Sequence, residues 1–146
     1  MFEPEIAGNV GAVLRLGACL GAAVDLIEPM GFAWDDRRVR RTAMDYIDHV
    51  VVARHASFDA FRTTVGSSRL VLFTTKSCQS AYEFRFRGDD VLLFGKESAG
   101  VPAAIAEVCD ARVRIPMRRE VRSMNLATAV ALALGEALRQ TASLPG

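Results

Sequence analysis

An arginine surrounded by small side chains is the first candidate for chemistry. Arg15 lies in a segment whose apolar residues recur with helical spacing, and it points away from that apolar stripe. Its neighbours one helical turn away are all small, so a ligand or a second chain could approach the guanidinium closely; they are Gly11, Ala12, Ala18 and Cys19. An ordinary exposed arginine fits the same spacing, which leaves both interpretations open.

A second basic group follows Trp34. Asp35 and Asp36 suit the N-terminus of a helix, through capping and through the helix dipole. Four arginines then share one side of that helix, where they could bind phosphates with salt-dependent affinity. A solvated face, partly neutralised by the two aspartates, fits equally well. The four residues are Arg37, Arg38, Arg40 and Arg41.

Several familiar catalytic patterns can be excluded. The stretch 95–100 has two glycines at P-loop spacing, but Val101 and Pro102 follow where lysine and a hydroxyl residue are needed. No G-x-G-x-x-G follows a strand, and no G-x-S-x-G elbow is present. His49 and His55 lack clustered carboxylates in the sequence, so we expect no metal site.

Length and composition limit the choice further. With 146 residues and 51% hydrophobic residues, the chain can form one domain over residues 1–146. A net charge of +1 means that any nucleic-acid surface must be a local patch. The odd set Cys19, Cys78 and Cys109 suggests reduced thiols in a cytoplasmic protein. The longest apolar run, Ala129–Leu134, is far below the ~20 residues that cross a bilayer, so no membrane partner is expected.

The elements that must position these residues alternate along the chain. Short β-rich runs are separated mostly by helix-like stretches, which predicts an α/β fold with a mostly parallel sheet flanked by helices. The predicted strands are Ala23–Ile27, Val50–Ala53, Leu70–Thr74, Val91–Phe94 and Arg112–Ile115.

Two helices have clear ends. The first is expected to begin with Asn9 as its N-cap and to end at Gly21. The last is expected to run from about Asn125 to Thr141. Its alanine-rich composition permits close packing, which is first a feature of a core or a dimer interface.

Three segments together resemble the motifs of the SPOUT methyltransferases, a class of RNA-modifying enzymes. Asn9–Arg15 is similar to the class pattern N-x-G-x-x-x-R, and Leu93–Pro102 is similar to F-G-x-E-x-x-G-L-P. The third segment is Ile115–Met117 followed by Arg122–Leu126, which opens the last helix. Each motif alone is weak, but all three in this order and spacing are specific.

Two further segments narrow the resemblance. Glu28–Arg38 and Thr74–Lys76 are similar to the members that methylate the wobble nucleotide of tRNA. The resemblance implies transfer of a methyl group from S-adenosylmethionine (SAM) to the ribose 2'-hydroxyl of cytidine or modified uridine at position 34. It also implies a homodimer that binds the anticodon region of tRNA, and Arg38 and Arg41 are its expected tRNA contacts. The alternative is an inactive SPOUT-like factor for RNA binding or assembly.

The resemblance implies a C-terminal trefoil knot that holds SAM in a bent conformation. Such knots are so rare that topology rules alone would not propose one. The positions that match cofactor contacts are Phe73, Gly95, Ile115 and Ser123. Glycine would allow close backbone approach, whereas Phe73 and Ile115 also fit simple core packing at strand ends.

The class assigns removal of the hydroxyl proton to the motif arginine, which is Arg15 here. A charged guanidinium is a poor proton acceptor, so we expect Arg15 to engage the substrate phosphate or hydroxyl. Whether it also accepts the proton stays open. Glu97 and Asn125 are expected to orient loops or substrate, with a structural role equally compatible.

The N-terminus departs from the class pattern. Relatives place a short apolar strand before the Glu-Pro-Glu segment, whereas only Met1 and Phe2 precede Glu3 here. Without that strand we expect lost burial and an exposed sheet edge, so that either the true start lies upstream or the fold tolerates the loss.

Overall fold

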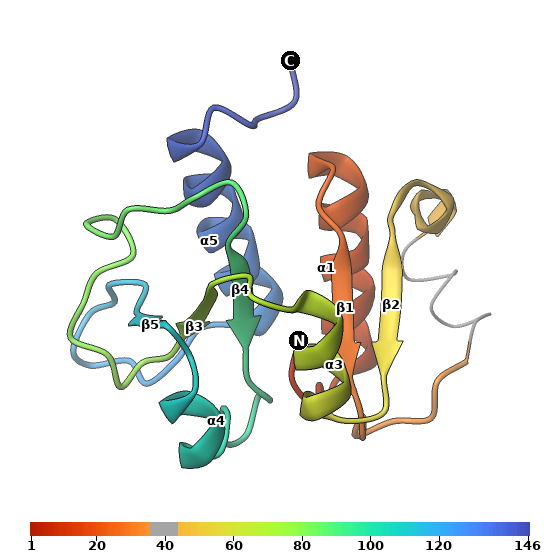
Figure 1. The fold of residues 1–146 in the computed structure, drawn as a ribbon, viewed down its shortest axis with the longest axis horizontal. Helices are drawn as coiled ribbons and strands as arrows, with labels where there is room; N and C mark the ends of the chain where they lie inside the picture. Colours follow the sequence, from red (N-terminus) through yellow and green to blue (C-terminus); the bar gives the residue numbers. More distant parts are fainter. Residues whose placement is uncertain (36–43) are drawn as a thin grey trace.

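Parallel strands form the centre of the molecule, for which the computed structural model describes residues 1–35 and 44–146 (Figure 1). Every strand pair in this part of the chain is parallel. In chain order the elements are α1 (Ala7–Leu20), β1 (Val24–Ile27), the 3-10 helix η1 (Met44–His49), β2 (Val52–His55), α3 (Phe58–Val65), β3 (Leu70–Phe73), β4 (Val91–Phe94), α4 (Ala103–Glu107), β5 (Ala111–Val113) and α5 (Leu126–Gln140).

The strands form two ladders that the N-terminal residues join. One ladder has the order β1-β2 and the other has the order β4-β3-β5. Phe2 lies between them: its N–H donates to the Phe94 carbonyl at 2.8 Å, and it pairs in parallel with Ile27. The Ile27 N–H in turn donates to the Met1 carbonyl at 2.9 Å. Residues 1–3 thus complete one end of a nearly continuous sheet.

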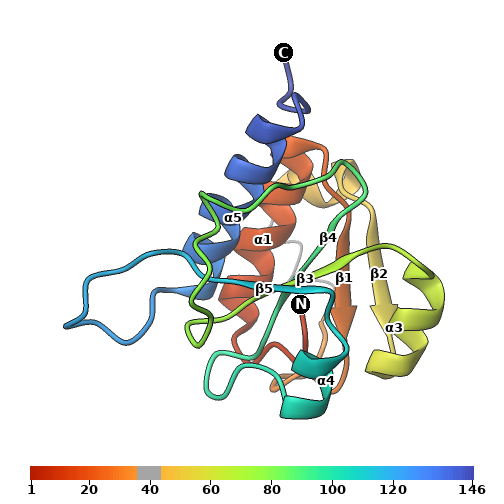
Figure 2. The same cartoon turned by 60° about the vertical axis from the view of Figure 1, so that its left-hand side comes forward.

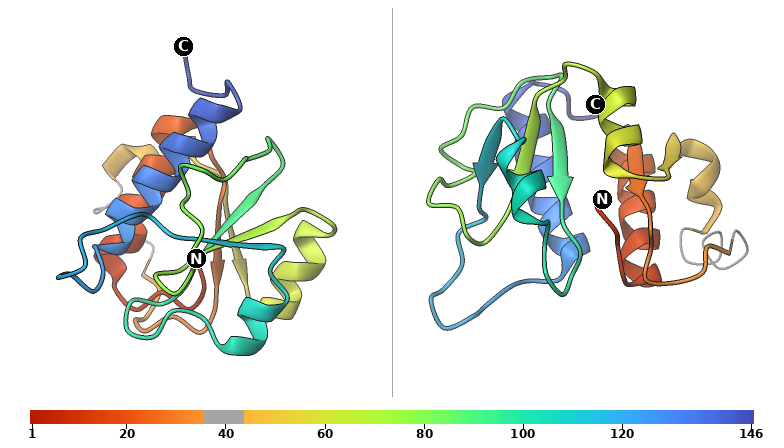
Figure 3. Two further views of the ribbon diagram at one scale, coloured as in Figure 1. Left: turned by 90° about the vertical axis from the view of Figure 1, so that its left-hand side faces the viewer. Right: turned by 60° about the horizontal axis from the view of Figure 1, so that its bottom comes forward.

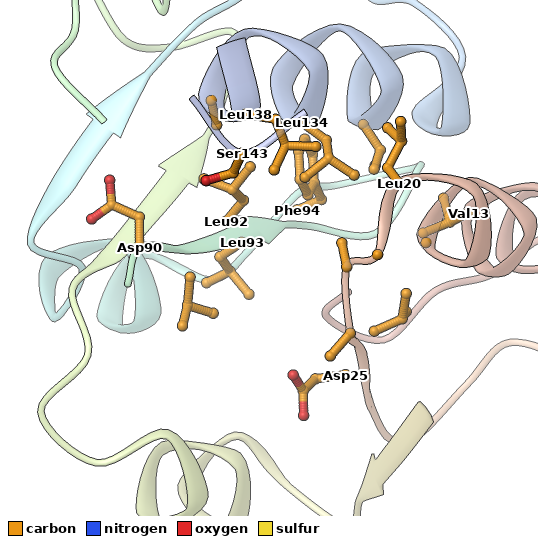
Figure 4. A pocket seen from close by; sticks show the side chains of 18 of the residues that line it. Val13, Leu20, Asp25, Asp90, Leu92, Leu93, Phe94, Leu134, Leu138 and Ser143 are labelled. Carbon is orange, nitrogen blue, oxygen red and sulfur yellow. The ribbon is translucent and has the colours of Figure 1, made fainter. Parts of the chain in front are cut away.

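This arrangement partly corrects the expected loss at the N-terminus. Met1 and Phe2 are buried, with 7% and 3% of their surface exposed. The seam between β1 and β4 is nevertheless open beyond Met1, where a cavity of about 470 Å³ lies among apolar side chains from both strands and both long helices (Figure 4). Val13, Leu92 and Leu134 are among those that line it. Instead of an exposed sheet edge, the structure therefore has only this cavity between β1 and β4 in the described part of the chain.

Helices cover both faces of the sheet (Figures 2 and 3). Side chains from α1 and α5 pack on one face in a cluster that includes Leu14, Val71 and Val130. On the other face, Phe61 of α3 and Ile105 of α4 pack over Leu72. All four residues of β3 are buried, as expected for a central strand of a parallel sheet.

The predicted α/β class is confirmed, and the element bounds shift by a few residues. The strand expected at Val50–Ala53 is observed at Val52–His55, and the last helix begins and ends as expected. The first helix was predicted wrongly at its start: α1 begins at Ala7, and Asn9 lies buried inside it. The trefoil knot stays a prediction, and Arg37, Arg38, Arg40 and Arg41 lie outside the described residues.

The predicted end of α1 at Gly21 is confirmed by a left-handed backbone, with φ of 69°. Close packing just before this end requires Gly17. A Cβ built at Gly17 would lie 2.7 Å from the Ala22 carbonyl oxygen and 3.0 Å from a methyl group of Val24. The turn from α1 into β1 therefore depends on the absence of a side chain at this position.

Gly17→Ala should lower the free energy of unfolding by about 1–3 kcal/mol, because the backbone carbonyl it meets cannot move aside easily. Gly8→Ala, in the same helix with nothing within 4 Å of the new Cβ, is the matched control and should stabilise by about 0.5–1 kcal/mol. Urea unfolding of both variants measures the difference. Equal effects at the two glycines would contradict the packing described for Gly17.

Candidate functional site

The carboxyl ends of β3, β4 and β5 open into a cavity of about 1210 Å³. Three loops line it: residues 74–77 after β3, residues 95–101 after β4, and residues 115–125 between β5 and α5. Crevices at the carboxyl ends of parallel strands are where α/β proteins bind ligands. This volume suffices for a cofactor the size of a dinucleoside or smaller.

The cavity brings together most of the side chains that the sequence singled out. Its lining includes all four predicted cofactor contacts and one predicted substrate contact: Phe73, Gly95, Ile115, Ser123 and Asn125. The first motif reaches it as well, through Asn9. Segments more than a hundred residues apart thus meet at one edge of the sheet.

Phe73 has a packing role as well as a place in the cavity wall. Only 9% of its surface is exposed, and its ring stacks on Phe94 with centroids 4.9 Å apart. A second stacking contact joins it to Phe86 at 6.2 Å. Phe73 and Phe94, together with Ile115 and Leu126, give the cavity an apolar side that fits a flat heteroaromatic group.

Gly95 is required by its own loop. A Cβ built there would lie 2.3 Å from the carbonyl carbon of Gly100. Lys96 and Gly100 form an antiparallel bridge, with the Gly100 N–H donating to the Lys96 carbonyl at 2.8 Å. The close backbone approach at Gly95 is made by Gly100 of the same loop, which lines the cavity, and a cofactor contact at Gly95 stays a prediction.

A hydrogen-bonded chain of three polar side chains connects the motifs. Asn9 donates through Nδ2 to Glu97 Oε1 at 2.9 Å, and its Oδ1 accepts from Asn125 Nδ2 at 2.9 Å. Asn125 also caps α5 by accepting from the Thr128 N–H. Asn9 was expected to be a helix cap. Its place inside the motif N-x-G-x-x-x-R was the signal for its actual role, which is to position Glu97 and Asn125.

The N-terminal segment also holds the loop after β4. Glu97 Oε2 accepts from the Glu5 backbone N–H at 2.8 Å. The Glu5 carboxylate accepts from both the hydroxyl and the N–H of Ser98, and these hydrogen bonds lower the pKa of Glu5. Lys96 contacts Glu3 at 2.8 Å, and this hydrogen bond raises the pKa of Lys96. Residues 3–5 therefore fix residues 96–98 at neutral pH.

Arg15 is positioned elsewhere. It is exposed on α1, with its guanidinium 4.9 Å from the centroid of the Tyr46 ring, and it is not among the residues that line the cavity. Six residues separate it from Asn9, which corresponds to about 9 Å along a helix. Within the described part of one chain, Arg15, the predicted catalytic residue, thus lies apart from the predicted cofactor residues.

The side chains present fit SAM. An apolar side suits the adenine, and loop amides around residues 95–100 and 115–125 can hydrogen-bond its polar edge.

Among the described residues, no group of three or more histidine, cysteine or acidic side chains could hold a metal ion. His55 does contact a carboxylate, that of Asp25 at 2.6 Å, but on the opposite ladder. Within the described ranges, no helix has the length and apolar character to cross a membrane.

Comparison with known proteins identifies the class. Residues 1–135 match the model of the SpoU rRNA Methylase family. The chain belongs to this family, and the resemblance to the SPOUT methyltransferases is confirmed.

Individual relatives are more specific. The chain is 51% identical to the tRNA (cytidine(34)-2'-O)-methyltransferase of Beijerinckia indica, over 99% of this chain and 91% of that enzyme. It is 42% identical to the enzyme of the same name from Escherichia coli K12, over 96% and 90% of the two chains.

Solved structures agree with these relatives. One described as "Structural insights into the 2-OH methylation of C/U34 on tRNA" has a TM-score of 0.90 at 41% identity, covering 95% of this chain and 91% of that one. Another is the SpoU methyltransferase AviRb from Streptomyces viridochromogenes in complex with AdoMet, with a TM-score of 0.82 at 28% identity. The match covers 99% of this chain and 57% of the AviRb chain.

The hydrogen-bonded chain predicts a specific effect at Glu97. Both groups that face its carboxylate are N–H donors, so Glu97→Gln places an amide N–H₂ against one of them. One part-buried donor then lacks an acceptor, which should lower the free energy of unfolding by about 1–3 kcal/mol in urea titrations.

The matched control is Glu83→Gln, because Glu83 is exposed and its side chain makes no hydrogen bond within the described residues. It should leave stability within about 0.5 kcal/mol of the unchanged protein. If both variants unfold alike, Glu97 does not hold the motifs together.

Proposed function

We propose that the protein is a tRNA (cytidine(34)-2'-O)-methyltransferase that transfers a methyl group from SAM to the ribose 2'-hydroxyl of the wobble nucleotide, cytidine or modified uridine. The observation that carries the proposal is the meeting of all three motif segments around one cavity at the carboxyl ends of β3, β4 and β5. The names of the most similar relatives support the same substrate.

Bound SAM supplies an electrophilic methyl group on a positively charged sulfonium. In this proposal Phe73 and Ile115 pack against the cofactor, while the backbone at Gly95 and Ser123 contacts its polar groups. The loops exclude water and align the substrate oxygen, which is the main catalytic task in methyl transfer. Asn125 would contact the substrate from the start of α5, and Arg38 and Arg41 would contact tRNA.

We also propose that the enzyme works as a homodimer of one-domain chains, residues 1–146, in the cytoplasm. Arg15 does not line the cavity of its own chain, which supports a site in which a second copy brings its guanidinium to the substrate phosphate or hydroxyl. The small side chains around Arg15 allow such an approach. The site would then combine the cofactor cavity of one chain with Arg15 of the other.

A methyl-transfer assay tests the activity. Purified protein, radiolabelled SAM and total tRNA should give labelled tRNA, and mapping should place the label on the 2'-oxygen of nucleotide 34. Arg15→Ala should abolish transfer while SAM binding, measured by calorimetry, persists. If the substitution removed SAM binding instead, Arg15 would belong to the cofactor site or the fold. An unmodified tRNA pool that acquires no label with the unchanged protein would exclude the activity.

Mixing two inactive variants tests the placement of Arg15. Gly95→Val should disrupt the cavity loop, and Arg15→Ala should remove the guanidinium. Co-refolded in equal amounts, they should recover about a quarter of full activity, because half of the dimers are mixed and each mixed dimer has one intact site. If Arg15 served the cavity of its own chain, no mixed site would be intact and no activity would return.

A further inference from the structure

The segment between β5 and α5 carries an unusual concentration of positive charge. Five arginines and one glutamate lie within residues 112–122, in a chain whose net charge is only +1. Figure 2 shows that this segment projects from the body of the molecule. The arginines are Arg112, Arg114, Arg118, Arg119 and Arg122, and all are exposed.

These arginines differ in their pairing from three other arginines of the surface. Arg69 contacts Asp90 at 2.6 Å, Arg139 contacts Glu136 at 2.8 Å, and Arg54 contacts Glu28. In contrast, no side chain of the five arginines in residues 112–122 makes a hydrogen bond or ion pair with any residue that the structure describes. Their charge is not neutralised locally, so it is available to an anionic partner.

The charged segment reaches the candidate cofactor cavity at two of its arginines. Arg112 and Arg122 line the cavity itself, together with Lys76 from the loop after β3. Arg114 lies two residues beyond Arg112 in an extended segment and therefore points to the same side. Arg118 and Arg119 lie between Arg114 and Arg122 in the same segment; both are exposed and neither lines the cavity.

We infer that the arginines of residues 112–122 form an RNA-backbone clamp that binds the phosphates on either side of the methylated nucleotide. This inference rests on the proposed function, since it names how the same site holds its RNA. Arg112 and Arg122 hold the phosphates nearest to the reacting ribose, and Arg118 and Arg119 hold those farther along the strand. Planar guanidinium groups suit phosphate oxygens, which they can contact with two parallel hydrogen bonds.

Arg118→Gln/Arg119→Gln tests the clamp without altering the cavity wall. Affinity for tRNA, measured by filter binding without SAM, should fall about tenfold or more. The slope of log affinity against log salt concentration should decrease in magnitude by about 1.5, as expected for two lost phosphate contacts. The KM for tRNA should rise in parallel, with the Kd for SAM unchanged.

Arg85→Gln/Arg87→Gln is the matched control. Both arginines are exposed and their side chains lack hydrogen-bond partners within the described ranges, but they precede the amino end of β4, at the opposite edge of the sheet. This double variant should keep the tRNA affinity, the salt slope and the KM of the unchanged protein. Thermal unfolding should give the same Tm for both double variants.

The possible results separate the clamp from the proposed function. If the Arg118/Arg119 variant binds tRNA as tightly as the control while the unchanged protein methylates tRNA, the clamp is wrong and the activity stands. If the unchanged protein binds tRNA through these arginines but transfers no methyl group, the clamp stands and the activity is wrong. If the unchanged protein does not bind tRNA at all, both are overturned.

Discussion

The carboxylate of Glu97 is the contact on which the candidate site depends. It accepts one hydrogen bond from the N-terminal backbone at Glu5 and one from Asn9 in α1, and Asn9 passes the connection to Asn125 at the start of α5. A part-buried carboxylate is stable only where such donors replace water. The same hydrogen bonds that satisfy Glu97 therefore fix the relative positions of segments that are distant in sequence, and the cavity takes its shape from them.

The N-terminal residues couple the closure of the sheet to the shape of this cavity. Phe2 joins the two ladders. Within the next three residues, Glu3 contacts Lys96 and Glu5 contacts Ser98. A change at the seam between β1 and β4 would thus affect the loop after β4, because the same short segment contacts Phe94, Lys96 and Ser98. Stability and ligand binding therefore share these residues.

Strand positions and fold class could be predicted from the sequence, because alternating β-rich runs and helix-like stretches have few compatible packings. The ends of α5 were equally accessible, since Asn125 caps by local chemistry. Asn9 was misassigned as a helix cap because its partners lie 88 and 116 residues away, and only its place in the motif N-x-G-x-x-x-R indicated a role beyond the helix end. The need for Gly95 arises from a loop that folds back on Gly100, which spacing alone does not indicate. The position of Arg15 relative to the cavity depends on how α1 packs.

The charges are distributed unevenly over the molecule, which its net charge of +1 does not reveal. Several acidic residues form ion pairs on the body of the protein, such as Asp90 with Arg69 and Glu136 with Arg139. The arginines of residues 112–122 have no such partners among the described residues, so five unpaired positive charges lie in one segment that reaches the edge where the parallel strands end. An RNA strand attracted to this edge would be drawn toward both this segment and the cofactor cavity. Local pairing elsewhere is thus as important for substrate orientation as the free guanidinium groups themselves.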